Sequence, residues 1–278
     1  LIGGIDPQGC AGIMADSQTV SAHGCHPVPL ITCLTQQTHQ GLTDFGSLDV
    51  EQFIKQYRSA VADIEIAAIK VGLIPNLDIA QAVLAILKQH NVPVIWDPVL
   101  ASTSGGVAVS SEVQDFLLQT LLPEISLLTP NTVELAQLTQ QDDQIEASQY
   151  LLTTGLNACL VKGGHADSKW ATDYFIDPSH SFYCYDYKQA KNVRGTGCVL
   201  AASIASNMAM NHDIRDAIVL AKAYLIRGIR QAKKVGPYYV VTHSSDEFEL
   251  CDIPKLTYSK RLVGQKFNFP LCPQRLGI

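Results

Sequence analysis

A glycine-rich turn next to a cysteine carries the residue types that phosphoryl transfer requires. Gly195, Thr196, Gly197 and Cys198 lead directly into a run of small residues with helical character at 199–208. A helix N-terminus presents unpaired N–H groups and the positive end of the helix dipole, so this turn suits the charge of a phosphoryl group. The dipole is also expected to lower the pKa of the Cys198 thiol, which could then accept a proton from a substrate hydroxyl. Packing of a small side chain is the alternative explanation for Cys198.

A second glycine-rich turn, residues 3–12, joins an apolar segment to a helical segment and contains four glycines. Such a turn lets backbone N–H groups approach a ligand closely. Gly4 and Gly9 have the spacing of a Walker A loop, but Cys10 and Ala11 occupy the positions that require Lys and Ser or Thr. The dinucleotide fingerprint Gly-x-Gly-x-x-Gly is also absent, which disfavours a nicotinamide-dependent dehydrogenase. A tight turn without a ligand is the structural alternative.

Polar side chains follow three further apolar runs. Asp97 comes directly after the first run, Asn131 and Glu134 after the second, and Lys162 ends the third. Asn131 and Glu134 are three residues apart at the start of a helical segment, so they can face the same side and reach a hydrated Mg²⁺ ion. Lys162 supplies a cation for phosphate. Taken singly, Asp97 or Glu134 is more often a helix cap or a solvated charge, and a surface turn is the alternative for Lys162.

The elements that must position these residues alternate between short apolar runs and segments of helical period. This pattern predicts an α/β fold with a mostly parallel central sheet and helices on both faces. The expected strands are residues 1–4, 28–34, 67–71, 94–96, 126–128 and 158–162, and residues 170–185 are expected to form a hairpin that turns at 177–180. The clearest expected helices are residues 11–23, 49–62, 77–90 and 213–233. Ligands of such sheets bind at the carboxyl ends of the strands, where the polar residues above would gather.

Composition narrows the class of protein. The chain has 278 residues, of which 47% are hydrophobic and 17% charged, a formal net charge of −6 and a mean hydropathy of +0.11. These values predict a globular protein without the cationic surface that nucleic acid or an anionic membrane would require. No apolar run is long enough to cross a membrane. The eight cysteines form no metal-binding pair, so we expect most of them to be reduced and buried, as in a cytoplasmic protein.

Four motifs, in this order and spacing, resemble the hydroxymethylpyrimidine and phosphomethylpyrimidine kinases of thiamine biosynthesis. They are Gly-x-Asp-Pro-x-Gly-x-Ala-Gly-Ile at 4–13, Thr-Pro-Asn-x-x-Glu at 129–134, Lys-Gly-Gly-His at 162–165 and Gly-Thr-Gly-Cys at 195–198. The resemblance covers about residues 1–256 and implies a ribokinase-like α/β domain. It also implies that ATP with Mg²⁺ is used twice, first on 4-amino-5-hydroxymethyl-2-methylpyrimidine and then on its monophosphate, yielding the diphosphate.

The resemblance assigns a role to each matching residue. The expected anion hole and base are Gly195, Thr196, Gly197 and Cys198. The expected substrate-side residues are Gly4, Asp6, Gly9 and Gln37. The expected ATP and phosphate ligands are Asn131, Glu134, Lys162 and Arg194. The expected Mg²⁺ ligands are Asp97 and Glu134. The planar amide of Gln37 suits the adjacent donor and acceptor of an aminopyrimidine edge.

Arg194 departs from the family pattern, which often has His at this position. An arginine can hold phosphate in a bidentate geometry, but it cannot take over a proton-relay role of that histidine. The departure leaves the phosphate-binding expectation intact and removes support for a proton relay.

Two other functions fit the same pattern. A pyridoxal kinase of the same fold would also phosphorylate a hydroxymethyl group on a heterocycle, and a non-catalytic pyrimidine sensor would keep only the pocket. Residues 257–278 differ in composition from the preceding chain, because the segment is mildly basic and contains two prolines. We expect them to be a tail or a linker into a second domain such as thiamine-phosphate synthase. By resemblance, the kinase domain is also expected to form a homodimer.

Overall fold

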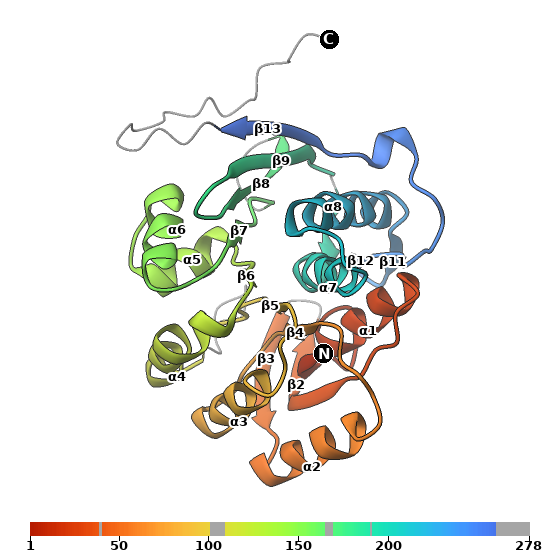
Figure 1. The fold of residues 1–278 in the computed structure, drawn as a ribbon. Helices are drawn as coiled ribbons and strands as arrows, with labels where there is room; N and C mark the ends of the chain where they lie inside the picture. The colour runs from red at the N-terminus through yellow and green to blue at the C-terminus, as the bar shows by residue number, and fades with distance from the viewer. Residues whose placement is uncertain (39–40, 101–108, 165–168, 190, 260–278) are drawn as a thin grey trace.

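A computed structural model describes the chain except for residues 39–40, 101–108, 165–168, 190 and 260–278 (Figure 1). Within the described residues, one ten-stranded sheet forms the centre of the molecule. Its strands, in spatial order, are β13 (Lys255–Ser259), β9 (Ser181–Tyr187), β8 (Trp170–Ile176), β7 (Cys159–Val161), β6 (Leu127–Leu128), β5 (Val94–Trp96), β4 (Ile69–Val71), β1 (Ile2–Ile5), β2 (Leu30–Thr38) and β3 (Gly41–Ser47). The strands from β7 to β2 are parallel, and antiparallel strands flank them on both sides.

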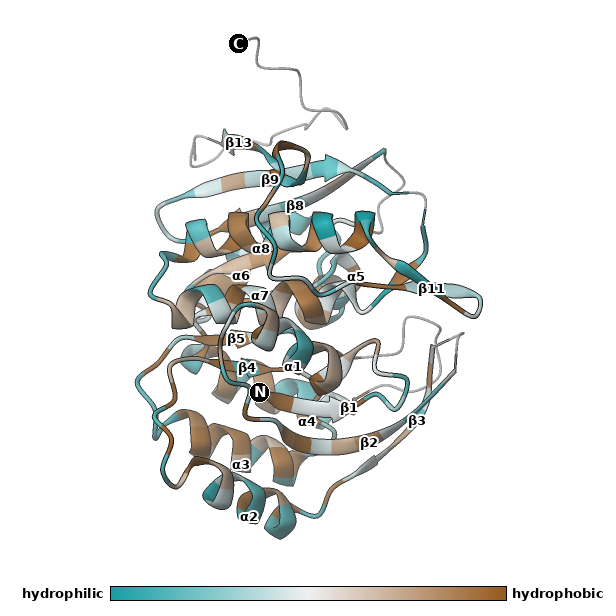
Figure 2. Cartoon of the chain, turned by 90° about the vertical axis from the view of Figure 1, so that its right-hand side faces the viewer, coloured by the Kyte–Doolittle hydropathy of each residue, from teal (hydrophilic) through white to brown (hydrophobic). Residues whose placement is uncertain are grey.

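Helices cover both faces of this sheet, as the alternation of apolar runs and helical segments predicts (Figure 1). One face carries α1 (Gly12–Ala22), α7 (Thr196–Ala209) and α8 (Ile214–Arg230). The other face carries α2 (Val50–Val61), α3 (Leu77–Leu87), α4 (Ser111–Phe116), α5 (Thr132–Thr139) and α6 (Gln144–Thr153). Figure 2 shows hydrophobic and hydrophilic residues alternating along α2, α3 and α8, which is the pattern of helices with one face on a core.

A second, three-stranded sheet lies beside the first. It consists of β10 (Val193–Arg194), β12 (Tyr238–Val240) and β11 (Lys233–Val235), with β10 parallel to β12. Because β10 ends immediately before α7, this small sheet fixes the position of Arg194 and of the turn at 195–198. These strands are two or three residues long and were not predicted from the sequence.

The expected strands and helices are present, with ends shifted by a few residues. The largest difference is β2, which continues to Thr38 because it pairs with β3, a strand that was not expected. The expected hairpin is confirmed as β8 and β9. Strand β13 crosses residue 256, where the kinase domain was expected to end, and pairs with β9 over its full length.

The composition led us to expect no membrane-spanning segment and mostly reduced, buried cysteines. No helix in the part of the chain that the structure describes has the length and hydropathy needed to span a membrane. The seven cysteines within the described ranges are free, and Cys10, Cys33, Cys159 and Cys184 are buried.

Candidate active site

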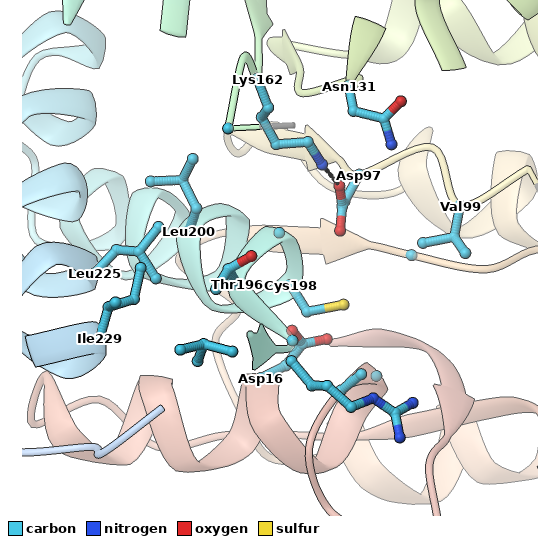
Figure 3. Close-up of a pocket in the computed structure, with 18 of the residues that line it drawn as sticks. Asp16, Asp97, Val99, Asn131, Lys162, Thr196, Cys198, Leu200, Leu225 and Ile229 are labelled. Atoms are coloured by element: carbon cyan, nitrogen blue, oxygen red, sulfur yellow. Dashed lines mark hydrogen bonds and ion pairs between the residues drawn. The ribbon is translucent and has the colours of Figure 1, made fainter. Parts of the chain in front are cut away.

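A cavity of about 880 Å³ opens at the carboxyl ends of the parallel strands. Most of the residues predicted from sequence line it, namely Gly4, Gln37, Asp97, Asn131, Glu134, Lys162, Arg194, Gly195, Thr196, Gly197 and Cys198. In Figure 3, apolar side chains of α7 and α8 lie on one side of the cavity and Asp97, Asn131 and Lys162 lie on the other, with Thr196 and Cys198 between them. The cavity therefore has an apolar end and a charged end, joined by the N-terminus of α7.

A lysine shared by two carboxylates forms the charged end. Lys162 Nζ lies 2.5 Å from Asp97 Oδ1 and 3.9 Å from Glu134 Oε2. Burial alone would lower the pKa of Lys162, but Asp97 and Glu134 outweigh it and raise that pKa. Lys162 therefore keeps its positive charge and lines the cavity, which suits an anionic ligand.

Asn131 and Glu134 form a reciprocal capping box at the start of α5. The Glu134 N–H donates to Asn131 Oδ1 at 2.8 Å, and the Asn131 N–H donates to Glu134 Oε2 at 2.7 Å. Burial, with Asp97 nearby, raises the pKa of Glu134 to about 7 although Lys162 opposes the shift. Asp97 is shifted the other way: burial raises its pKa, but Lys162 and Lys70 outweigh burial and lower it. Asn131 and Glu134 therefore cap helix α5 and also line the cavity.

The donor set fits a magnesium ion shared with phosphates rather than a closed protein cage. Across the described ranges, no three His, Cys, Asp or Glu side chains are grouped to hold a metal ion. Asp97 and Glu134 provide two carboxylates beside one lysine. Mg²⁺ is commonly bound by one or two carboxylates together with waters and substrate phosphates, so these residues are compatible with it.

The turn at 195–198 is closed tightly against the first glycine-rich turn. Gly195 has φ 76°, and a Cβ at this position would lie 1.7 Å from the carbonyl oxygen of Cys10. A Cβ at Gly197 would lie 3.1 Å from Lys162 Nζ. Gly195 is therefore required by close approach and by its backbone angle, whereas a Cβ at Gly197 would press on the end of the Lys162 side chain. The turn lines the cavity, and α7 begins there without a side-chain cap.

The expected lowering of the Cys198 pKa is wrong for this structure. Burial raises the pKa of the Cys198 thiol to about 12, helped by Asp97 and Asp16, while Lys70 and the Gly12 N–H act in the opposite direction. The desolvation of a buried thiolate destabilises it more than the helix N-terminus and the Lys70 ammonium group stabilise it. In the absence of ligands, Cys198 is a neutral thiol.

A buried ion pair lies at the cavity wall and was not predicted from the sequence. Lys70 Nζ from β4 donates to Asp16 Oδ2 from α1 at 2.8 Å, and both side chains are almost fully buried. Asp16 Oδ1 has no hydrogen-bond partner among the described residues. Burial by itself lowers the pKa of Lys70, but Asp16, Cys198 and Asp97 outweigh burial and raise it. The only sequence signal is a lysine inside an apolar run.

Asp6 and Gly9, which were expected on the substrate side, do not line the cavity. The buried Asp6 carboxylate accepts hydrogen bonds from the N–H groups of Gln8, Cys10 and Ala11, at 2.9 to 3.1 Å. Gly9 has φ 70° and shapes the same turn. Asp6 therefore holds the first turn in shape, because its short carboxylate satisfies the N–H groups of its own loop.

Gln37 and Arg194 both line the cavity and are hydrogen-bonded to each other. Arg194 Nη2 donates to Gln37 Oε1 at 2.9 Å, and Gln37 Nε2 donates to Thr35 Oγ1 at 2.9 Å. Thr35 in turn donates to the Ile5 carbonyl oxygen at 2.7 Å. These bonds fix which way the Gln37 amide points. The expected ligand to ATP, Arg194, thus lies next to the residue expected to bind the pyrimidine.

The far end of the cavity combines apolar side chains with another buried ion pair. Leu200, Leu225 and Ile229 form an apolar wall (Figure 3). Lys222 Nζ lies 2.6 Å from Asp173 Oδ2, and Asp173 Oδ1 accepts from the Gly163 N–H at 3.1 Å. This pair therefore holds Gly163, the residue after Lys162. His165, the last residue of that motif, lies outside the described residues.

Comparison with known proteins gives one consistent family. The profile of the phosphomethylpyrimidine kinase family matches residues 6–243. The hydroxymethylpyrimidine/phosphomethylpyrimidine kinase of Escherichia coli (strain K12) is 32% identical over 239 residues, which cover 83% of this chain and 90% of that protein.

Solved structures with the same fold include two kinases. A phosphomethylpyrimidine kinase from Clostridium difficile superposes with a TM-score of 0.71 at 30% identity, covering 82% of this chain and 97% of that one. The pyridoxal kinase from Staphylococcus aureus in complex with AMP-PCP superposes with a TM-score of 0.83, covering 93% and 97% of the two chains. At 22% identity, the second match shows a shared fold.

Proposed function

The chain belongs to the phosphomethylpyrimidine kinase family, and we propose that it transfers the γ-phosphoryl group of ATP first to the hydroxymethylpyrimidine and then to its monophosphate. The single observation that carries this proposal is the layout of the cavity. The Gln37 amide contacts Arg194, which directly precedes the turn at 195–198, and Figure 3 shows Leu225 on the other side of Thr196 from Asp97. Heterocycle, phosphoryl group and adenine would occupy these three places in that order.

In this arrangement, the substrate ring lies beside Gln37 and Gly4. The Gln37 amide is held by Arg194 and Thr35, so its remaining hydrogen-bonding capacity has a fixed direction. A Cβ at Gly4 would lie 2.8 Å from Cys33 Sγ, so glycine keeps this strand end compact beside the ring. A fixed amide can pair with the adjacent donor and acceptor of an aminopyrimidine.

The phosphoryl group would lie at the N-terminus of α7. The backbone N–H groups of 195–198 and the Lys162 ammonium group face this place and stabilise charge on the phosphoryl oxygens in the transition state. Asp97 and Glu134 are the residues that would hold Mg²⁺. When bound, Mg²⁺ would supply charge neutralisation between the phosphates of ATP. Positioning and electrostatics then provide most of the acceleration.

Cys198 has different tasks in the two steps. In the first step, the substrate oxygen bonds to the γ-phosphorus, the bond to the β-phosphate oxygen breaks, and the hydroxyl proton must leave. In the second step, the attacking oxygen belongs to an ionised phosphate and has no proton to lose. Only the first step therefore needs an acceptor for a proton, and the Cys198 thiolate would be that acceptor. Because burial raises the pKa of Cys198 to about 12, little thiolate is present at neutral pH, so we expect Cys198 to contribute modestly to the first step and to be dispensable for the second.

The test is ATP consumption with three acceptors: the hydroxymethylpyrimidine, its monophosphate and pyridoxal. We expect turnover with both pyrimidines and weak or no turnover with pyridoxal. Turnover with pyridoxal and none with the monophosphate would instead identify a pyridoxal kinase. Binding of the pyrimidine in a calorimeter without any turnover would identify a sensor. A homodimer and a cytoplasmic location stay predictions from the family resemblance.

A further inference from the structure

Tyr238 lies next to both glycine-rich turns without lining the cavity itself. It is the first residue of β12, and it is only 7% exposed. Arg194 of β10 pairs with Val240 of β12. Because side chains alternate between the two faces of a strand, Tyr238 lies on the same face as Val240 and is a diagonal neighbour of Arg194. The Arg194 guanidinium accordingly lies 5.2 Å from the centre of the Tyr238 ring.

The hydroxyl group of Tyr238 contacts the first glycine-rich turn. It donates to Gln8 Oε1 at 3.3 Å, and the Cys10 thiol donates to it at 3.9 Å. Cys10 and Tyr238 are both buried, so the contact between them is shielded from water. One side chain of the small sheet therefore contacts the first turn through its hydroxyl group and, through its ring, the residue that directly precedes the turn at 195–198.

The two turns lie against each other and both line the cavity. A Cβ at Gly195 would lie 1.7 Å from the Cys10 carbonyl oxygen, so the backbones of the two turns are in contact there. The first turn lines the cavity through Gly4 and Gly12, and the second turn lines it over its whole length. A shift of one turn against the other would therefore change the alignment of ligands held by the two turns. A misplacement of about 1 Å can lower a reaction rate about 100-fold.

We propose that Tyr238 is a positioning residue for the phosphoryl transfer, which holds the first glycine-rich turn in register with the turn at 195–198. This inference rests on the proposed function, in which the first turn borders the acceptor and the second turn borders the phosphoryl group. Tyr238 acts through Gln8 and Cys10 on one side and through Arg194 on the other. Its replacement leaves the groups that bind each ligand in place and changes only their alignment. The loss therefore falls on kcat, for both acceptors, rather than on KM.

The primary test is Tyr238→Phe, which removes the hydroxyl group and keeps the ring beside Arg194. We expect kcat with each pyrimidine to fall about 3- to 10-fold, while KM for ATP and for the acceptor changes by less than about twofold. Tyr238→Leu, which also removes the ring, should lower kcat about 10- to 100-fold. Assays well below the melting temperature of every variant keep unfolded protein from lowering kcat. An unchanged kcat in Tyr238→Phe, or a change in KM alone, would overturn the proposal.

Tyr239→Phe is the matched control, because it removes the same hydroxyl group from the next residue of the same strand. The Tyr239 side chain lies on the opposite face of β12, where the centre of its ring is 5.6 Å from Lys191 Nζ. This variant should keep the kcat and KM values of the wild-type protein. A loss of kcat equal to that in Tyr238→Phe would assign both effects to a general weakening of the small sheet, and the proposal would fail.

A double-mutant cycle tests the path through Gln8. Because the Tyr238 hydroxyl group acts on the Gln8 amide, its removal should have little further effect once Gln8 is replaced by alanine. The kcat of Gln8→Ala/Tyr238→Phe should therefore lie within about twofold of the lower of the two single variants. Losses that multiply in the double variant would show that the two side chains act independently and would contradict this path.

Hydrogen exchange separates this inference from the proposed function. If the wild-type protein phosphorylates neither pyrimidine, the proposed function fails, but the hold of Tyr238 on the first turn can still be measured. The N–H groups of Gln8, Cys10 and Ala11 donate to Asp6 and report on the shape of this turn. They should exchange at least about threefold faster in Tyr238→Phe than in the wild type and in Tyr239→Phe. Equal exchange rates in the three proteins would overturn the inference independently of turnover.

Discussion

Three lysines in the cavity wall are each held against a carboxylate from another element. Lys70 lies on Asp16, Lys162 on Asp97 and Lys222 on Asp173, at 2.8, 2.5 and 2.6 Å. The pair of Lys70 and Asp16 is closed off from solvent, whereas Lys162 also lies 3.9 Å from Glu134 and faces the cavity. Burying two charges is unfavourable even when they are paired. We therefore infer that the pair of Lys70 and Asp16 fixes the position of α1 relative to β4 and adds little to the stability of the fold.

Asp16→Asn should be much less stable than the wild-type protein. It leaves the Lys70 ammonium group buried without its counter-charge, which typically costs about 3 to 5 kcal/mol. The double variant Asp16→Leu/Lys70→Met, which removes both charges, should recover most of the lost free energy of unfolding. Denaturant unfolding of the three proteins measures this difference. Equal losses in the single and double variants would show that packing, not the unpaired charge, sets the cost.

Gly197→Val should abolish turnover with both pyrimidines, whereas Cys198→Ser should reduce turnover with the hydroxymethylpyrimidine and leave turnover with the monophosphate nearly unchanged. A Cβ at Gly197 already meets Lys162 Nζ at 3.1 Å, so the branched side chain of valine would fill the place of the phosphoryl group. Serine keeps the size and the backbone of residue 198 and removes only a neutral thiol. The kcat with each pyrimidine checks both variants. Small and equal effects of the two substitutions would contradict the assignment of this turn.

At the residue scale, most of the site residues predicted from sequence motifs line the cavity, but the motifs did not predict its charge pairs. Asp97, Lys162 and Cys198 were identifiable because each follows a strand or glycine turn with a family spacing. Lys70 and Asp16 were not, because they are 54 residues apart and meet only when α1 covers β4. For Asp6 the prediction failed because a residue in a motif can serve the fold of its own loop.

At the scale of elements, the N-termini of the helices divide into two groups. Among the α-helices of the described ranges, α2, α3, α4, α5, α6 and α8 have a side-chain cap, whereas α1 and α7 have none. Both uncapped N-termini line the cavity, through Gly12 and through residues 195–198. A capping side chain would compete with an anion for the same N–H groups, so leaving these two ends open serves the site.

Asn131→Ala and Asn76→Ala form a matched pair of cap variants. Asn131 caps α5 inside the cavity, and Asn76 caps α3 outside it, each accepting from the N–H three residues on. Both substitutions should lower the free energy of unfolding by about 1 kcal/mol. Only Asn131→Ala should also raise KM for ATP, because it removes an amide side chain that lines the cavity and accepts from the Glu134 N–H. Thermal unfolding and KM for ATP measure the two effects, and an equal KM change in both variants would contradict the nucleotide role.

Element prediction succeeded where a single segment contains its own signal. The helices near 49–62 and 77–90 begin at Asp49 and Asn76, whose caps are readable in the sequence, and both are confirmed. Strands β3, β10 and β12 were not predicted because they are stabilised by pairing with another strand rather than by their own residue pattern.

At the scale of the whole molecule, strand order brings the charged end of the cavity together. Strands β5, β6 and β7 are neighbours in the sheet and parallel, so Asp97, Asn131 and Lys162 emerge side by side at the same edge. This part of the site was predictable from the fold class alone. The contribution of the small sheet was not, because Arg194 reaches Gln37 across 157 residues of chain through a pairing that no sequence pattern indicates.

The sheet also fixes where the kinase domain can be cut. Lys255 to Ser259 pair with β9, and Lys255 Nζ lies 4.9 Å from the ring centre of Trp170 and 5.0 Å from that of Tyr187. Without β13, β9 becomes an exposed edge strand, and both cation–π contacts are lost. We therefore propose that the kinase domain continues past residue 256, at least to residue 259.

Chains ending at residues 254 and 259 test this boundary. The shorter chain should lose about 2 kcal/mol, which corresponds to a melting temperature about 4 to 8 °C lower, and it should aggregate more readily because its edge is open. The longer chain should match the 278-residue protein in melting temperature and in KM for ATP. Thermal unfolding with light scattering measures both properties. Equal melting temperatures for the two truncated chains would return the boundary to residue 256 or before, and would mean that β13 adds a strand to the sheet without supporting it.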